Sequence, residues 1–73
     1  MSESVRVLFP QPRDVFVDGA RCGATNDVFT VETGTHTFDL GPTGDYSPPR
    51  VRIRVSGTSP LAPKIIAFQM VEA

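Results

Sequence analysis

Three arginines alternate with aliphatic residues in the sequence RVRIRV of residues 50–55. Because side chains alternate between the two faces of a strand, Arg50, Arg52 and Arg54 are expected to share one face, over about 13 Å at the usual rise per residue. A guanidinium binds carboxylates and phosphates through forked pairs of hydrogen bonds. The run therefore predicts a docking strip for the anionic groups of a protein partner, an acidic glycan or a nucleic acid.

The simpler interpretation of these arginines, which we favour from the sequence, is a solvated strand face, whose charges deter edge pairing and meet Glu32 or Asp39 across the sheet. The chain carries six acids and one arginine in residues 14–45, but four cations and no acid in residues 46–71. Its net charge is −1, whereas nonspecific nucleic-acid binding needs an excess of positive charge. Among the functional interpretations, we therefore rank a protein partner first and nucleic acid last.

Two aromatic residues, Phe16 and Tyr46, are candidates for contact with a sugar or a protein partner. Strand alternation directs Phe16 outward, opposite Arg21 on the next strand. The competing interpretation of Phe16, which we favour, is a cross-strand cation–π pair with Arg21 that covers the sheet. Together with the three arginines of residues 50–55, Phe16 and Tyr46 form the predicted partner-binding set.

No combination of residues in the chain points to catalysis. The sequence has one cysteine and one histidine, without a glycine-rich phosphate loop or paired metal ligands. Cys22 lacks a second cysteine or a nearby histidine, so we expect a small buried hydrophobic residue. We expect a backbone carbonyl to satisfy His36, because alternation points the nearby Asp39 to the opposite face. The sequence therefore predicts a noncatalytic protein without cofactor-binding or metal-binding residues.

Residues that favour strands recur in seven short runs separated by turn residues, with no proline inside a run. This spacing predicts one all-β domain over residues 1–73, a small antiparallel β-sandwich of about seven strands. Pro63 also permits a helix in the last run, but the adjacent Ile65 and Ile66 favour a strand. The expected strands are residues 5–9, 15–17, 20–24, 28–31, 35–40, 51–55 and 65–71.

Two connections carry specific turn chemistry. Asp18 and Gly19 both tolerate the positive φ of a type I′ turn, so they predict a two-residue hairpin. That register places Cys22 opposite Val15 and facing the core. The sequence Glu32-Thr33-Gly34 predicts a second hairpin, with a bulge and with glycine in the left-handed conformation.

The length and composition of the chain limit its stability and its partners. A domain of 73 residues has an expected stability of about 3–5 kcal/mol, which a partner or self-association would increase. A single cysteine excludes an intramolecular disulfide. The N-terminal residues lack the apolar run of a signal peptide, and no segment reaches membrane-spanning length. We therefore expect a cytoplasmic protein without membrane contact, unless the chain is one domain of an exported protein.

Three segments of the chain carry a family resemblance: VFVDG at residues 15–19, GAT at 23–25 and GTHTF at 34–38. Their order and spacing resemble the PEGA domain of bacterial and archaeal proteins, over about residues 5–55. The chain departs from the family pattern at Asn26, where proline is usual, and at Asp45-Tyr46, where Gly-Tyr is usual. The resemblance implies a β-sandwich of the transthyretin or carboxypeptidase-regulatory type, used as a noncatalytic module.

The sequence leaves two functions open. The first, which we choose, is a noncatalytic protein-interaction or structural module, suggested by the resemblance, the small size and the apolar residues 65–71. The alternative is a module that binds carbohydrate or another anionic ligand through exposed aromatics and the arginine-bearing strand. An exposed, coplanar aromatic pair would favour the alternative, whereas a last strand covered at a subunit contact would favour the first.

Overall fold

In a computed structural model, the chain forms β-strands and no helix within the residues described, 2–41 and 44–71. This confirms the all-β expectation, and each of the seven expected runs contains a strand. The last run is a strand, as preferred, but it is divided in two. Residues 1, 42, 43, 72 and 73 of the domain expected over 1–73 lie outside the described residues.

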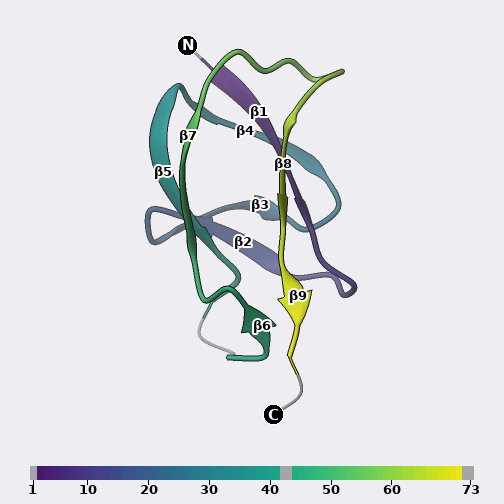
Figure 1. The fold of residues 1–73 in the computed structure, drawn as a ribbon. Helices are drawn as coiled ribbons and strands as arrows, with labels where there is room; N and C mark the ends of the chain where they lie inside the picture. Colours follow the sequence, from purple (N-terminus) through teal and green to yellow (C-terminus); the bar gives the residue numbers. More distant parts are fainter. Residues whose placement is uncertain (1, 42–43, 72–73) are drawn as a thin grey trace.

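The described strands form two larger sheets and a small two-stranded one (Figure 1). The first sheet has the order β4-β1-β8, with β1 at Ser2–Leu8, β4 at Val28–Glu32 and β8 at Lys64–Ala67. The second has the order β3-β2-β5-β7, with β2 at Asp14–Val17, β3 at Ala20–Ala24, β5 at Gly34–Asp39 and β7 at Val51–Val55. The short strands β6 (Tyr46–Ser47) and β9 (Gln69–Met70) pair with each other.

The strand pairs are antiparallel, as expected, except for β1 and β8, which are parallel over Val5–Leu8 and Lys64–Ala67. A hairpin forces neighbouring strands into opposite directions. β8 joins β1 only after the chain has passed through the other sheet. No hairpin therefore sets the direction of β8.

Both larger sheets contribute to one hydrophobic core. Val5 and Val7 of β1, Val15 of β2, Phe38 of β5 and Val55 of β7 all have an exposed fraction of 0%. Their inward positions follow the two-residue period of a strand. The same period directs the intervening residues to the outer faces of the sheets.

Asp18 and Gly19 form the turn between β2 and β3, as predicted. Their φ angles are 52° and 87°, and a type I′ turn requires positive values at both positions. Phe16 lies opposite Arg21, so the predicted register holds beside the turn.

Replacing Gly19 with valine is expected to lower the free energy of unfolding by at least about 1 kcal/mol, because a β-branched residue resists positive φ. A Cβ atom at Gly19 would meet nothing within 4 Å, so the loss would come from backbone strain. Urea denaturation measures the change, and Gly19→Asn is the control because asparagine tolerates the left-handed region. An unchanged urea midpoint for Gly19→Val would refute the importance of this turn.

A β-bulge places Cys22 outside the core, so the prediction of a buried cysteine was wrong. The register between β2 and β3 shifts between Val15 and Phe16, and Val15 pairs with Gly23. Cys22 becomes the additional residue of the bulge, and it is exposed. The turn fixes the register only as far as the first bulge.

The hairpin predicted at Glu32-Thr33-Gly34 does not form. β4 pairs with β1, whereas β5 pairs with β2 and β7. Thr33 therefore connects the two larger sheets. Gly34 has the expected positive φ, 137°, but it begins β5 opposite Val55.

Candidate binding surface

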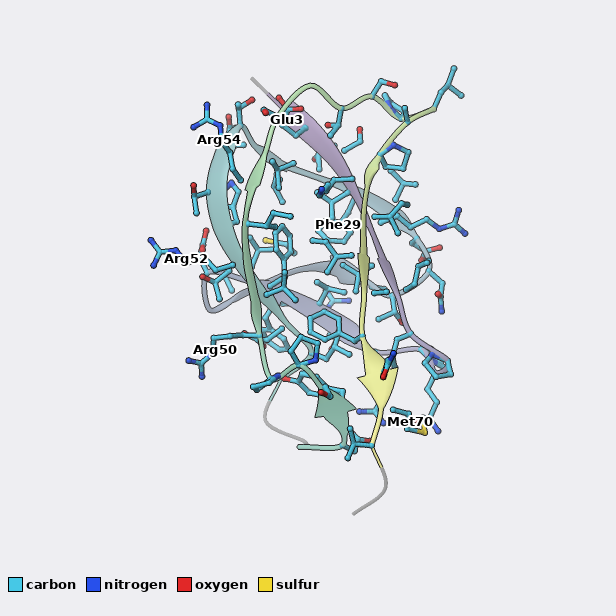
Figure 2. All side chains as sticks on the ribbon, viewed as in Figure 1. Glu3, Phe29, Arg50, Arg52, Arg54 and Met70 are labelled. Carbon is cyan, nitrogen blue, oxygen red and sulfur yellow. The ribbon has the colours of Figure 1, made fainter. Side chains whose placement is uncertain are left out.

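Arg52 and Arg54 lie on the outer face of β7, at one edge of the four-stranded sheet, and Arg50 directly precedes this strand. Arg50, Arg52 and Arg54 are exposed, whereas the residues between them are half-buried. Figure 2 shows the three side chains pointing away from the molecule on the same side. The alternation predicted from the sequence is confirmed.

Neutral side chains on β5 lie opposite two of these arginines. Thr37 is opposite Arg52, and Thr35 is opposite Arg54. Within residues 2–41 and 44–71, none of the three arginines forms an ion pair. The ion pairs with Glu32 or Asp39 that the simpler interpretation expects are therefore not formed, although Asp39 and Arg50 line one pocket. We call Arg50, Arg52 and Arg54, together with Thr35 and Thr37, the arginine face.

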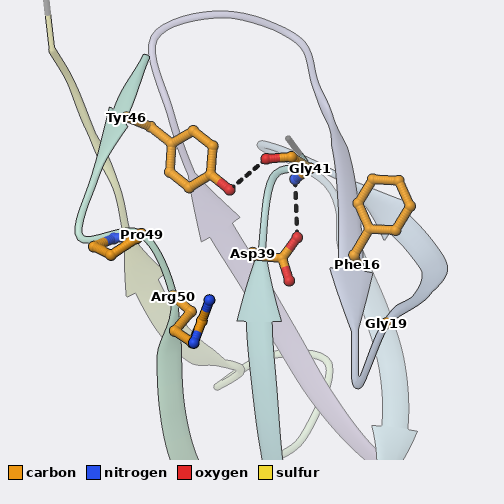
Figure 3. A pocket seen from close by; sticks show the side chains of 7 residues that line it. All are labelled: Phe16, Gly19, Asp39, Gly41, Tyr46, Pro49 and Arg50. Atoms are coloured by element: carbon orange, nitrogen blue, oxygen red, sulfur yellow. Dashed lines mark hydrogen bonds between the residues drawn. The ribbon is translucent and has the colours of Figure 1, made fainter. Parts of the chain in front are cut away.

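A shallow, open pocket of about 330 Å³ adjoins the arginine face (Figure 3). Phe16, Asp39, Tyr46 and Arg50 contribute to its lining. The Asp39 carboxylate accepts a hydrogen bond of 2.9 Å from the N–H of Gly41. The pocket thus brings together three of the five predicted binding residues.

Tyr46 is part of the wall of the pocket and not an exposed stacking surface. Its hydroxyl donates to the carbonyl of Gly41 at 2.6 Å and accepts from the N–H of Leu40 at 3.2 Å. Its ring makes edge contacts with Phe9 and Phe68, at centroid distances of 6.4 and 5.4 Å. Tyr46 therefore fixes the segment after β5 to the core.

Phe16 is half-buried on the outer face of the four-stranded sheet. Arg21 lies opposite Phe16, as predicted, but the cation–π pair expected between them does not form. Its guanidinium pairs with Asp14, with Nε 2.9 Å from Oδ1. The ring of Phe16 remains part of the pocket, on the side away from Tyr46 (Figure 3).

Both ring nitrogens of His36 face hydrogen-bond acceptors. Nδ1 lies 2.6 Å from Oδ2 of Asp18, and Nε2 lies 2.6 Å from the carbonyl oxygen of Glu32. A neutral imidazole donates from one nitrogen only, whereas the protonated ring can donate to both acceptors. The two contacts therefore raise the pKa of His36, and the hydrogen bond to Asp18 contributes most. The hydrogen bond to His36, followed by one from the N–H of Thr37, lowers the pKa of Asp18. The carbonyl contact was predicted, but the contact with Asp18 was not.

A buried carboxylate that sequence reasoning missed lies in β1. Glu3 is 7% exposed, and its Oε2 accepts a 2.5 Å hydrogen bond from the hydroxyl of Thr33. Its Oε1 accepts bonds from the N–H and hydroxyl of Thr58, at 2.9 and 2.7 Å. These bonds, with that of Thr33 the largest contributor, lower the pKa of Glu3 to about 2. Strand parity was the available signal, because Glu3 shares a face with Val5 and Val7.

A forked ion pair, also missed, joins Arg13 to Asp45. The guanidinium nitrogens lie 3.0 and 2.6 Å from the two carboxylate oxygens. The same guanidinium lies over the ring of Phe9, 5.3 Å from its centroid. This pair has the forked geometry by which a guanidinium binds a carboxylate.

The end of the chain has both buried and exposed apolar residues. Ile66 and Phe68 belong to the core, whereas Ile65, Met70 and Val71 are 49%, 42% and 41% exposed. The described residues contain no cluster of three or more His, Cys, Asp or Glu placed to hold a metal ion. They also contain no helix with the length and apolar character needed to cross a membrane.

Comparison with protein-family models, with curated proteins and with solved structures finds no match for this chain.

Proposed function

We propose that the chain is a noncatalytic interaction module that binds an acidic protein partner through the arginine face. The observation that carries this proposal is the alignment of Arg50, Arg52 and Arg54 without an ion pair to any described residue. Three guanidinium groups at a spacing of about 6.6 Å engage successive carboxylates by forked hydrogen bonds. A protein partner is preferred to nucleic acid because the net charge is −1.

The proposed family and compartment follow from other features of the chain. A PEGA-type module of the transthyretin or carboxypeptidase-regulatory architecture remains our proposal, supported by the motif order at residues 15–38 and by the two-sheet arrangement. The cytoplasm is the proposed compartment.

Binding of a carbohydrate or a small anionic ligand is the second candidate. It is favoured by the pocket, which combines the ring of Phe16 with the polar groups of Asp39 and Arg50. Tyr46 gives it less support than expected, since its hydroxyl and ring are engaged within the chain. Phe16 and Tyr46 are both half-buried and do not form an exposed aromatic pair, so the protein-partner proposal remains first.

Replacing Arg50, Arg52 and Arg54 together with glutamine is expected to abolish retention of the partner in a pull-down from native lysate. Their exposed side chains imply that the variant keeps its fold, which circular dichroism checks. Salt should weaken retention by the unmodified protein, because exposed charges are screened beyond about 8–10 Å near physiological ionic strength. The measurement is mass spectrometry of the retained proteins.

A matched control replaces Arg6, Arg21 and Lys64 with glutamine, which removes the same number of positive charges outside the arginine face. This control is expected to retain the same proteins as the unmodified chain. Equal capture by the arginine-face variant would make these arginines a solvated surface only. A shift of short DNA or RNA by the unmodified chain at moderate salt would replace the protein partner with nucleic acid.

A further inference from the structure

β7 ends the four-stranded sheet and pairs only with β5 among the described strands. Its register with β5 runs without a shift from Val51 to Val55. On an edge strand, alternate residues direct their N–H and C=O groups away from the sheet. The five residues of β7 include no proline or glycine. β7 therefore presents a regular, continuous edge to which another strand can pair.

The core is incompletely covered along this edge. Val51 and Ile53 point inward from β7 and pack against the core, yet both are only half-buried. Phe38, which lies opposite Val51 on the neighbouring strand, has an exposed fraction of 0%. A further strand beside β7 would cover the apolar side chains that the edge leaves half-exposed.

A second copy of β7 is a poor partner for this edge. Antiparallel pairing centred on Arg52 would place Arg52 opposite Arg52, and Arg50 opposite Arg54. Directly opposed like charges destabilise a strand pair, whereas opposed unlike charges stabilise it. The arginine face thus disfavours self-pairing and selects a strand with acidic residues at the opposed positions.

We infer that the partner supplies an extended segment with acidic residues at alternate positions, which adds to β7 as a fifth strand of the sheet. The carboxylates would lie opposite Arg50, Arg52 and Arg54, and the apolar residues between them would face Val51 and Ile53. Main-chain hydrogen bonds give such strand addition its affinity, and alternate side chains give it specificity. This inference rests on the proposed function, because it names the partner of the same arginine face.

Synthetic peptides test the inference with the intact chain. The probe is the peptide Thr-Glu-Val-Glu-Val-Glu-Thr with a fluorescent label at its N-terminus, followed by fluorescence polarisation at low salt. The composition control, Thr-Val-Glu-Glu-Glu-Val-Thr, keeps the charge but not the alternation. A third peptide replaces each glutamate with glutamine. We expect the unmodified chain to bind both control peptides at least about tenfold more weakly than the first peptide. We expect the same loss when the arginine-face variant binds the first peptide.

Backbone methylation separates strand addition from docking by side chains alone. One peptide is N-methylated at its glutamates and another at its valines, and only one of these sets of amides faces β7 in a paired strand. We expect one methylated peptide to lose at least about tenfold in affinity and the other to bind like its parent. Equal loss in both, or in neither, would overturn strand addition.

The remaining outcomes are equally distinct. Equal binding of the alternating and consecutive glutamate peptides would overturn the register, and failure of the alternating peptide to bind would overturn the inference. The proposed function fails separately, when the arginine-face variant retains the same lysate proteins as the unmodified chain. Loss of that retention without peptide binding would leave the arginine face as a docking surface that does not use strand addition.

Discussion

Replacing Gly23 with valine is expected to lower the free energy of unfolding by about 2–3 kcal/mol. A Cβ atom at Gly23 would lie 2.6 Å from Cγ and Cδ1 of Phe29, and 3.0 Å from its Cβ. Gly23 is in β3 and Phe29 in β4, so this contact joins the two larger sheets. The clash involves the base of the phenylalanine side chain, which cannot move away by rotating its far end. For a domain with about 3–5 kcal/mol of stability, this substitution would unfold a large part of the population.

Urea denaturation measures this effect, and Ala20→Val is the matched control. Ala20 lies in the same strand but is exposed, and valine suits a strand, so the control should keep its midpoint. The φ of Gly23 lies outside the left-handed region, which leaves the steric clash as the cause. Adding Phe29→Leu should recover part of the loss in a double-mutant cycle. Unchanged stability of Gly23→Val would contradict this contact between the sheets.

Acidification is expected to destabilise the protein as the pH falls from about 4.5 toward about 2, because Glu3 must be protonated. The hydrogen bonds from Thr33 and Thr58 lower its pKa in the folded state to about 2 from an ordinary value of 4.5. A depressed pKa contributes stability above the unfolded value and loses it as the pH drops through the folded value. Urea midpoints at neutral pH and at pH near 3 measure the loss.

Glu3→Gln should lower the urea midpoint at neutral pH. It should also reduce the amount by which this midpoint falls on acidification. Glutamine has one carbonyl oxygen in place of two carboxylate oxygens, so it can accept from Thr58 or from Thr33 but not from both. Asp27→Asn, at an exposed position, is the control for loss of one negative charge. Asp18 also has a lowered pKa, so the variant keeps a smaller response to acid. An identical acid response in Glu3→Gln and the unmodified chain would contradict the role of Glu3.

Local patterns in the sequence predict the strands and the face of each side chain, because both depend on neighbouring residues. The type I′ turn follows from Asp18 and Gly19, and the exposure of the three arginines follows from alternation in residues 50–55. The inward position of Phe38 follows from the same period. These features need no knowledge of which strands are neighbours.

Features that depend on distant neighbours were missed or mistaken. Glu32-Thr33-Gly34 has the composition of a hairpin, but composition does not reveal that β4 and β5 belong to different sheets. The bulge that exposes Cys22 places Gly23 opposite Val15, where β3 meets Phe29 of the other sheet. The partners of Glu3 lie 30 and 55 residues away in the chain, so no short motif contains them.

The candidate site was predictable in its residues but not in its geometry. Sequence reasoning identified Phe16, Tyr46 and the three arginines of residues 50–55. It did not predict that Tyr46 would be fixed by Gly41, nor that Asp39 would join Phe16 and Arg50 in one pocket. Those relations arise from the order of β2, β5 and β7 in the sheet, which is a property of the tertiary fold.

The central claim is that an extended acidic segment binds along β7 at the arginine face. Its most direct test is the amide correlation spectrum of the protein during titration with the alternating glutamate peptide. We expect the largest chemical-shift changes in β7, with smaller changes in β5 and at Phe16, because these segments form the arginine face and its pocket. Changes concentrated instead at Leu8, Val28 and Ile65, the exposed apolar residues of the other sheet, would contradict the claim. So would a spectrum that does not change at all.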